Sequence, residues 1–119
     1  MISKHYRHKK KIVVFWMTQN YDLIQNEMFP YVINLQLDND WKRVRLVLCE
    51  PSIKLIALDQ ELKENLKDLR RTGIELQACI SHNYSNIQSI VLADLGIKEV
   101  YMRDPFREYK KANWAVLFF

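Results

Sequence analysis

The fold is decided by the stretch GIELQAC at residues 73–79. Its composition is typical of a buried strand, and Gly73 stands where a preceding helix would end in the left-handed conformation that glycine favours. The polar residues Ser81 and His82 follow, and a helical pattern begins after them. A helix, a buried strand and a second helix in succession are typical of a parallel α/β sheet.

The same alternation extends over the rest of the chain. Strands are predicted at residues 11–17, 43–49, 74–78, 99–102 and 114–119, and helices at residues 21–37, 51–71, 83–95 and 105–111. Pro30 should kink the first helix or start a new turn, and Leu58 belongs to the apolar stripe of the second helix. We therefore predict an α/β fold, a three-layer α/β/α sandwich with a mostly parallel five-stranded sheet, flavodoxin-like in general architecture.

The positive charge of the chain is concentrated at its start. The formal net charge is +4, but residues 4–11 contain five lysines and arginines and no acid, which leaves 13 basic against 14 acidic residues. We assign residues 1–10 to a basic tail and residues 11–119 to a single domain. Such a tail can contact nucleic acid or simply stay solvated. Because the body offers no matching basic face, nucleic acid is not an expected partner.

The chain contains two cysteines, Cys49 and Cys79, which do not make a disulfide framework. The sequence leaves open whether they are bridged. The apolar run IVVFWM at residues 12–17 is too short for a secretory segment, and no run is long enough to cross a membrane. We therefore expect a cytoplasmic protein without a membrane partner.

Both glycines of the chain, Gly73 and Gly96, lie between a predicted helix and the following strand. None is left for a loop that leads from a strand into a helix. A dinucleotide-binding fingerprint and a P-loop both need glycines there, so that backbone N–H groups can reach phosphate. Thr18 and Cys79 also occupy positions where a phospho-acceptor receiver domain would carry acids. Dinucleotide-binding proteins, P-loop proteins and phospho-acceptor receiver domains are therefore excluded, and no cofactor is expected.

The carboxyl ends of the predicted strands carry the candidate site, because parallel sheets usually bind ligands there. Cys79 is the candidate nucleophile, with its pKa lowered by the following helix N-terminus and with His82 facing it across the first turn. The remaining pocket-lining candidates are Thr18, Gln19, Asn20, Glu50, Ser52 and Ser81. Cys79 and His82 supply only two ligands, so no metal site is expected. The alternative is an inert, buried Cys79, as we interpret Cys49 to be.

A set of ordered segments extends over nearly the whole chain after the tail. These segments are residues 12–16, 34–36, 44–52, 58–62, 73–79, 95–97 and 100–102. Together they resemble the DsrE/DsrF-like (YchN-like) family. The resemblance implies a compact three-layer α/β/α domain that forms oligomers, often trimers or hexamers. It also implies sulfur relay, with sulfur carried as a persulfide on the cysteine that corresponds to Cys79.

The chain departs from that family pattern at two places. His82 stands where relatives carry a second cysteine, and Cys49 stands where they often carry tryptophan. Any sulfur chemistry is therefore expected to use one cysteine. The leading hypothesis is a sulfur carrier or sulfurtransferase-like protein with sulfur donor or acceptor proteins as partners. The alternative is a non-catalytic oligomeric binding protein. The apolar strand at residues 114–119 would be an open edge in a monomer, which favours a homo-oligomer.

Overall fold

The computed structural model describes residues 10–80 and 86–119, and within these ranges five parallel strands form one sheet in the order β4-β3-β2-β1-β5. The strands are β1 (Lys11–Trp16), β2 (Arg43–Leu48), β3 (Glu75–Ile80), β4 (Lys98–Tyr101) and β5 (Ala115–Phe118). The helices are α1 (Tyr21–Leu23), η2 (Ile24–Met28), α2 (Phe29–Leu37), α3 (Glu50–Ala57), α4 (Gln60–Arg71), α5 (Asn86–Asp94) and α6 (Pro105–Lys111). The predicted α/β fold is confirmed.

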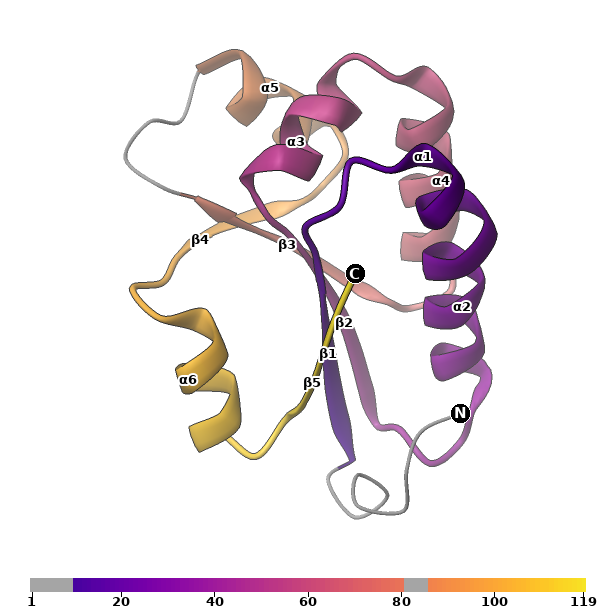
Figure 1. The fold of residues 1–119 in the computed structure, drawn as a ribbon, viewed down its shortest axis with the longest axis vertical. Coiled ribbons are helices and arrows are strands. Elements are labelled where there is room, and N and C mark those ends of the chain that lie inside the picture. Colours follow the sequence, from indigo (N-terminus) through magenta and orange to yellow (C-terminus); the bar gives the residue numbers. More distant parts are fainter. Residues whose placement is uncertain (1–9, 81–85) are drawn as a thin grey trace.

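The two helical layers are unequal (Figure 1). From β1 to β4 the chain crosses the sheet in one direction, so right-handed connections place α1 through α5 on the same face. The connection from β4 to β5 runs back across the sheet and places α6 alone on the other face. The general architecture is flavodoxin-like as predicted, but the strand order differs from the 2-1-3-4-5 order of flavodoxin itself. No described helix is long and apolar enough to cross a membrane.

Strand β1 lies at the centre of the packing. Its residues Ile12, Val14 and Trp16 face the large core beneath α1 to α5, while Val13 and Phe15 face the smaller core beneath α6. All five side chains are fully buried. Alternate residues of a strand point to opposite faces, so continuous burial shows that both faces of β1 are covered.

The predicted helix at residues 51–71 is two helices. Asp59 accepts a hydrogen bond from the Leu62 N–H at 3.0 Å and caps the start of α4, which separates it from α3. Leu58 is therefore 90% exposed in the turn, and its assignment to the apolar stripe was wrong. Gly73 and Gly96 adopt φ angles of 99° and 71°, which confirms the predicted left-handed helix ends.

The predicted helix at residues 21–37 contains a local change of pitch. A π-helical segment, η2, separates α1 from α2, and Pro30 lies in the first turn of α2. Proline has no N–H to donate and its ring crowds the preceding turn, so the hydrogen-bond pattern must change ahead of it. The helical backbone continues from Tyr21 to Leu37, with the change of pitch ahead of Pro30 in place of a separate new turn.

A charged cluster occupies the amino end of the face beneath α6. The Glu75 carboxylate accepts hydrogen bonds from Arg43 at 2.8 Å and from Arg45 at 2.6 and 3.0 Å. The guanidinium groups of both arginines lie over the Trp114 ring. The two arginines, with Arg43 contributing most, lower the pKa of Glu75 to about 2 against burial, which acts to raise it.

Replacing Glu75 with glutamine should destabilise the protein in a pH-dependent way. Because the folded pKa is depressed from 4.5 to about 2, the carboxylate stabilises the fold fully above pH 4.5 and loses this effect as the pH falls toward 2. We expect Glu75→Gln to lower the free energy of unfolding by about 1 kcal/mol at pH 7, since water screens the partly exposed pairs.

Urea denaturation at pH 7 and pH 3 measures this difference. The difference in free energy of unfolding between the wild-type protein and Glu75→Gln should be smaller at pH 3 than at pH 7. Glu64→Gln is the control, because Glu64 pairs with Lys67 on an exposed helix surface and should contribute less. An equal difference in free energy of unfolding at both pH values would contradict stabilisation by the ionised Glu75 carboxylate.

Candidate functional site: two neighbouring thiols

The pairing of β1 with β5 continues past the ends of both strands at the carboxyl edge of the sheet. The direction of chain progression reverses between β1 and β5, and ligands usually bind at the carboxyl ends of such strands. Here the N–H groups of Met17 and Thr18 donate hydrogen bonds to the Phe119 carbonyl at 2.7 and 3.1 Å. The Phe119 N–H in turn donates to the carbonyl of Phe15 at 2.9 Å.

The three polar residues predicted after β1 stabilise the local loop. Thr18 Oγ1 accepts a hydrogen bond from the Asn20 N–H at 3.0 Å, and Asn20 Oδ1 caps α1 by accepting from the Leu23 N–H at 3.1 Å. The Gln19 amide donates to the Pro51 carbonyl at 3.1 Å and ties this loop to the start of α3. These contacts place all three residues at the expected carboxyl edge of the sheet.

The predicted residues after β2 and β3 differ in how they are placed. Ser52 is completely buried, and its hydroxyl oxygen lies 3.0 Å from the Trp16 carbonyl oxygen and 2.7 Å from that of Cys49. Ser52 therefore connects the start of α3 to the end of β1, and it does not line an open pocket as predicted. Glu50 lies in the first turn of the same helix. Ser81 and His82 lie outside the described residues, so their roles stay predictions.

Cys79 lies within β3, because the strand continues to Ile80 rather than ending at the predicted residue 78. It pairs in register with Val100 of β4. Its side chain faces α6 and is half-buried against the apolar cluster on that side of the sheet. The cluster consists of Val13, Phe15, Val47, Tyr109 and Trp114, and the residues packed against it are Cys49, Cys79, Met102, Phe106 and Val116.

The predicted lowering of the Cys79 pKa is wrong. Burial beneath α6 raises the pKa of this thiol, and the negative charge of Glu108 adds to the effect. The backbone N–H of Met102 beside the sulfur acts in the opposite direction but is the weaker influence. The described part of helix α5 starts at Asn86, and residues 81–85 lie outside the described residues.

Cys49 lies next to Cys79, which the sequence interpretation missed. Leu48 pairs with Ala78 across β2 and β3, so Cys49 and Cys79 are the next positions in the same register. The Cys49 N–H still donates to the Trp16 carbonyl at 3.0 Å, which extends the sheet hydrogen bonding to this residue. Both thiols pack on the face beneath α6, and both are free.

The surroundings of Cys49 suppress its ionisation strongly. Burial raises the pKa of Cys49 to about 12, and the neighbouring Cys79 adds to the rise. Two neighbouring thiols therefore share this face of the sheet, and chemistry through one cysteine stays a prediction. Among the described residues no group of three metal-ligating side chains occurs.

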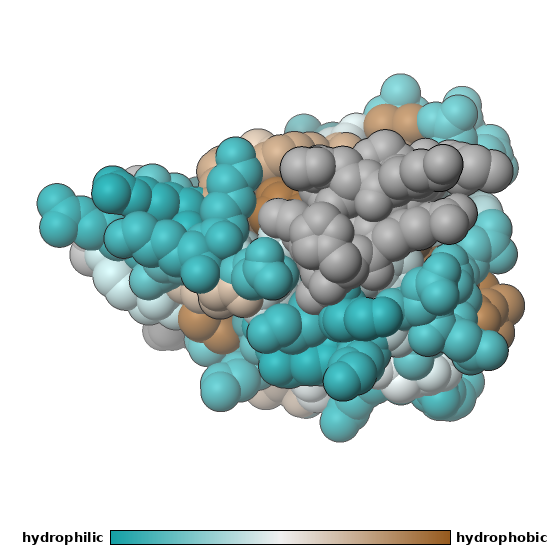
Figure 2. Space-filling view, turned by 90° about the horizontal axis from the view of Figure 1, so that it is seen from below, coloured by the Kyte–Doolittle hydropathy of each residue, from teal (hydrophilic) through white to brown (hydrophobic). Residues whose placement is uncertain are grey.

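The two ends of the molecule differ. The end with the strands' amino termini presents mainly hydrophilic side chains with small apolar patches, outside the residues drawn in grey (Figure 2).

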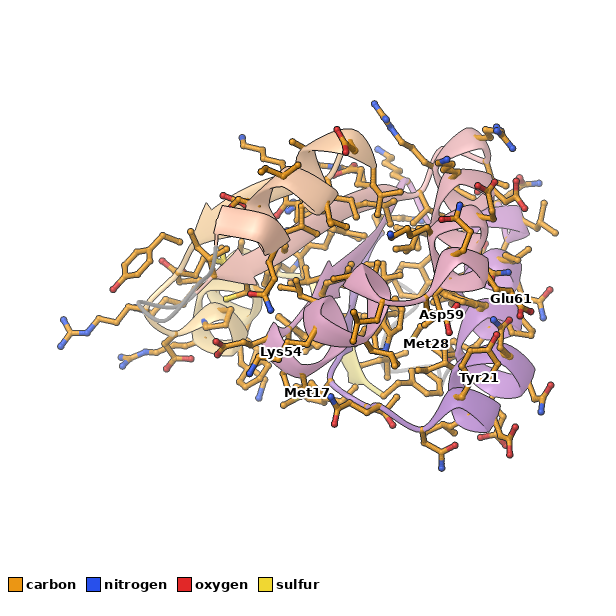
Figure 3. All side chains as sticks on the ribbon, turned by 90° about the horizontal axis from the view of Figure 1, so that it is seen from above. Met17, Tyr21, Met28, Lys54, Asp59 and Glu61 are labelled. Carbon is orange, nitrogen blue, oxygen red and sulfur yellow. The ribbon has the colours of Figure 1, made fainter. Side chains whose placement is uncertain are left out.

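From the carboxyl end, the side chains of Tyr21 on α1 and Glu61 on α4 approach each other, on the helical side away from α6 (Figure 3). Glu61 raises the pKa of the Tyr21 hydroxyl. This contact joins two helices and lies apart from the thiols.

Thiol alkylation should follow the order of burial. At pH 8 we expect iodoacetamide to modify Cys79 more slowly than a free cysteine and Cys49 more slowly still, because the thiolate is the reacting form. Both rates should rise as the pH increases above 9. Peptide mass spectrometry of native protein, with urea-unfolded protein as control, measures them. A Cys79 rate that is already maximal at pH 7 would contradict the raised pKa.

Comparison with known proteins supports the fold. No protein-family model and no curated protein matches the chain. A conserved protein of unknown function from Bacteroides thetaiotaomicron, BT1422, has a similar structure with a TM-score of 0.82 and 27% identity, over 92% of this chain and 95% of that chain. The YchN protein of E. coli matches with a TM-score of 0.55 and 12% identity, over 92% and 99%. The chain therefore has a YchN-like three-layer α/β fold.

Proposed function

We propose that this protein is a small sulfur carrier of DsrE-like type that holds sulfane sulfur as a persulfide on Cys79. The observation that carries the proposal is the position of this thiol. Cys79 lies near the carboxyl end of a central strand, half-buried, with the Met102 N–H directed at its sulfur. The YchN-like fold and the sequence resemblance support the same assignment.

The proposed reaction is a transfer between two sulfur atoms. The Cys79 thiolate attacks the terminal sulfur of a donor persulfide, R–S–SH, and forms the new S–S bond. The donor S–S bond breaks and its electron pair leaves with the donor thiolate, R–S⁻, so that Cys79–S–SH results without net oxidation. An acceptor thiolate takes the terminal sulfur by the same step in reverse.

The local environment suits storage of sulfur more than fast attack. Burial keeps Cys79 largely in the thiol form at neutral pH, so loading is slow unless a partner changes its surroundings. Once formed, a persulfide would lie on the sheet face beneath α6, near Met102, where the apolar cluster limits access by external thiols. Soft, polarisable sulfur is accommodated well in such a setting.

Sulfur loading should depend on Cys79 alone. Incubation with a low-molecular-weight persulfide donor should add the mass of one sulfur atom to the Cys79 peptide, and Cys79→Ser should abolish this addition. Cys49→Ser is the matched control and should still load. The initial rate should increase from pH 7 to pH 9, since the Cys79 pKa is raised. The absence of added sulfur on Cys79 in every protein would refute the proposed function.

A non-catalytic oligomeric binding protein is the second candidate, and a different observation favours it. Helix α6 covers only part of its face of the sheet, and both outer strands carry exposed aromatic side chains. Tyr101 on β4 is 61% exposed and Phe118 on β5 is 52% exposed. Open edge strands with apolar side chains favour association with other chains, which we propose to be copies in a trimer or hexamer.

Light scattering after size-exclusion chromatography tests this assembly. We expect a particle mass of three or six times the 14.3 kDa of the chain. Phe118→Lys should reduce the mass, because it places a charge on the open edge. Leu58→Lys is the matched control, since Leu58 is exposed on the opposite helical layer and should have no effect. A monomeric wild-type protein at micromolar concentration would contradict the prediction.

A further inference from the structure

Cys49 and Cys79 are close enough to react with each other. They occupy the positions that follow the Leu48–Ala78 pair on adjacent parallel strands, and both face α6. Adjacent strands lie about 4.8 Å apart. Disulfide-bonded cysteines have Cα atoms about 4.4 to 6.8 Å apart. The register alone therefore brings the two backbones within the range that a disulfide spans.

We infer that Cys49 is the resolving thiol for Cys79, attacking the Cys79 sulfur when that sulfur carries a leaving group and closing a Cys49–Cys79 disulfide. In the persulfide form the Cys49 thiolate attacks Sγ of Cys79, the bond from Sγ to the terminal sulfur breaks, and hydrosulfide leaves with the electron pair. The persulfide substrate rests on the proposed function, whereas the pairing of the two thiols does not.

The step is balanced without an external oxidant. Before it, Cys79 carries a persulfide and Cys49 a thiolate; after it, one disulfide and one hydrosulfide ion remain. The sulfane sulfur takes up the two electrons and is released as sulfide. An external dithiol must then reduce the protein disulfide, and it is oxidised to its own disulfide in doing so. When no acceptor thiol takes the sulfur first, this cycle releases it as sulfide.

Proximity compensates for the low acidity of Cys49. With a pKa of about 12, about one Cys49 in 10⁴ is ionised at pH 8. Well-oriented groups within one molecule react as if at concentrations of about 10⁵ M or more, whereas an external thiol is present at millimolar levels. Even a small part of that advantage exceeds the loss from incomplete ionisation.

The surroundings also favour the internal partner over an external one. Both thiols are half-buried beneath α6, and the Glu108 carboxylate lies close enough to Cys79 to raise its pKa. An approaching external thiolate is negatively charged, so Glu108 repels it as well as hindering ionisation of Cys79. Cys49 does not have to enter the site from solvent, since it already lies beside Cys79 at the end of the adjacent strand β2.

Sulfur release after loading tests the persulfide step. The wild-type protein and Cys49→Ser are loaded with a low-molecular-weight persulfide donor, desalted and followed by non-reducing peptide mass spectrometry and a sulfide assay. We expect the wild-type protein to release sulfide and gain a Cys49–Cys79 cross-linked peptide, while Cys49→Ser retains its persulfide at least tenfold longer. Equal persulfide lifetimes, or added sulfur found on Cys49, would overturn the inference.

Thiol–disulfide exchange with a small aliphatic disulfide tests the pair independently of persulfide chemistry. We expect the wild-type protein to form the internal disulfide and release two small thiols per chain, whereas Cys49→Ser and Cys49→Ala stop at a mixed disulfide on Cys79. Circular dichroism verifies that both variants fold. A stable mixed disulfide on wild-type Cys79 would overturn the inference. If the internal disulfide forms but no sulfur is ever loaded on Cys79, the proposed function is refuted, whereas the role of Cys49 as resolving thiol is supported.

Discussion

The handedness of the connections between parallel strands is the constraint on which the rest of this structure depends. Because right-handed crossovers carry the chain from β1 to β4 in one direction, all the intervening helices lie on one face of the sheet. Only the last connection reaches the other face, and it contributes the short helix α6. One face therefore has a thick apolar layer, while the other has a thin layer in which polar and reactive side chains are tolerated.

The distribution of residues follows from this inequality. The thin side holds the Arg43–Glu75–Arg45 cluster at one end and both thiols at the other, with Phe15 and Tyr109 packed between them. The thick side is built almost entirely from aliphatic and aromatic residues. Burial on the thin side is incomplete, so charges there keep some contact with water, and the thiols lie close to the surface without being freely exposed.

Local signals in the sequence predicted the fold well, and non-local geometry limited what could be predicted of the site. Gly73 and Gly96 marked helix ends correctly because the left-handed conformation depends on the residue itself. The break at Asp59 was missed because its neighbours continue a helical apolar pattern. The Cys49–Cys79 pairing depends on strand register. Two cysteines at corresponding ends of successive predicted strands were the available signal, and the raised pKa values required knowing what α6 covers.

The small size of α6 has a consequence for how the thiols become accessible. Helix α6 has seven residues, and Tyr109 is its only buried residue. Segments with few buried contacts open at a lower free energy than the core they cover. Transient detachment of α6 would expose Cys49 and Cys79 while the large core beneath α1 to α5 stays folded. Access of external reagents to both thiols is then governed by the local opening equilibrium of α6.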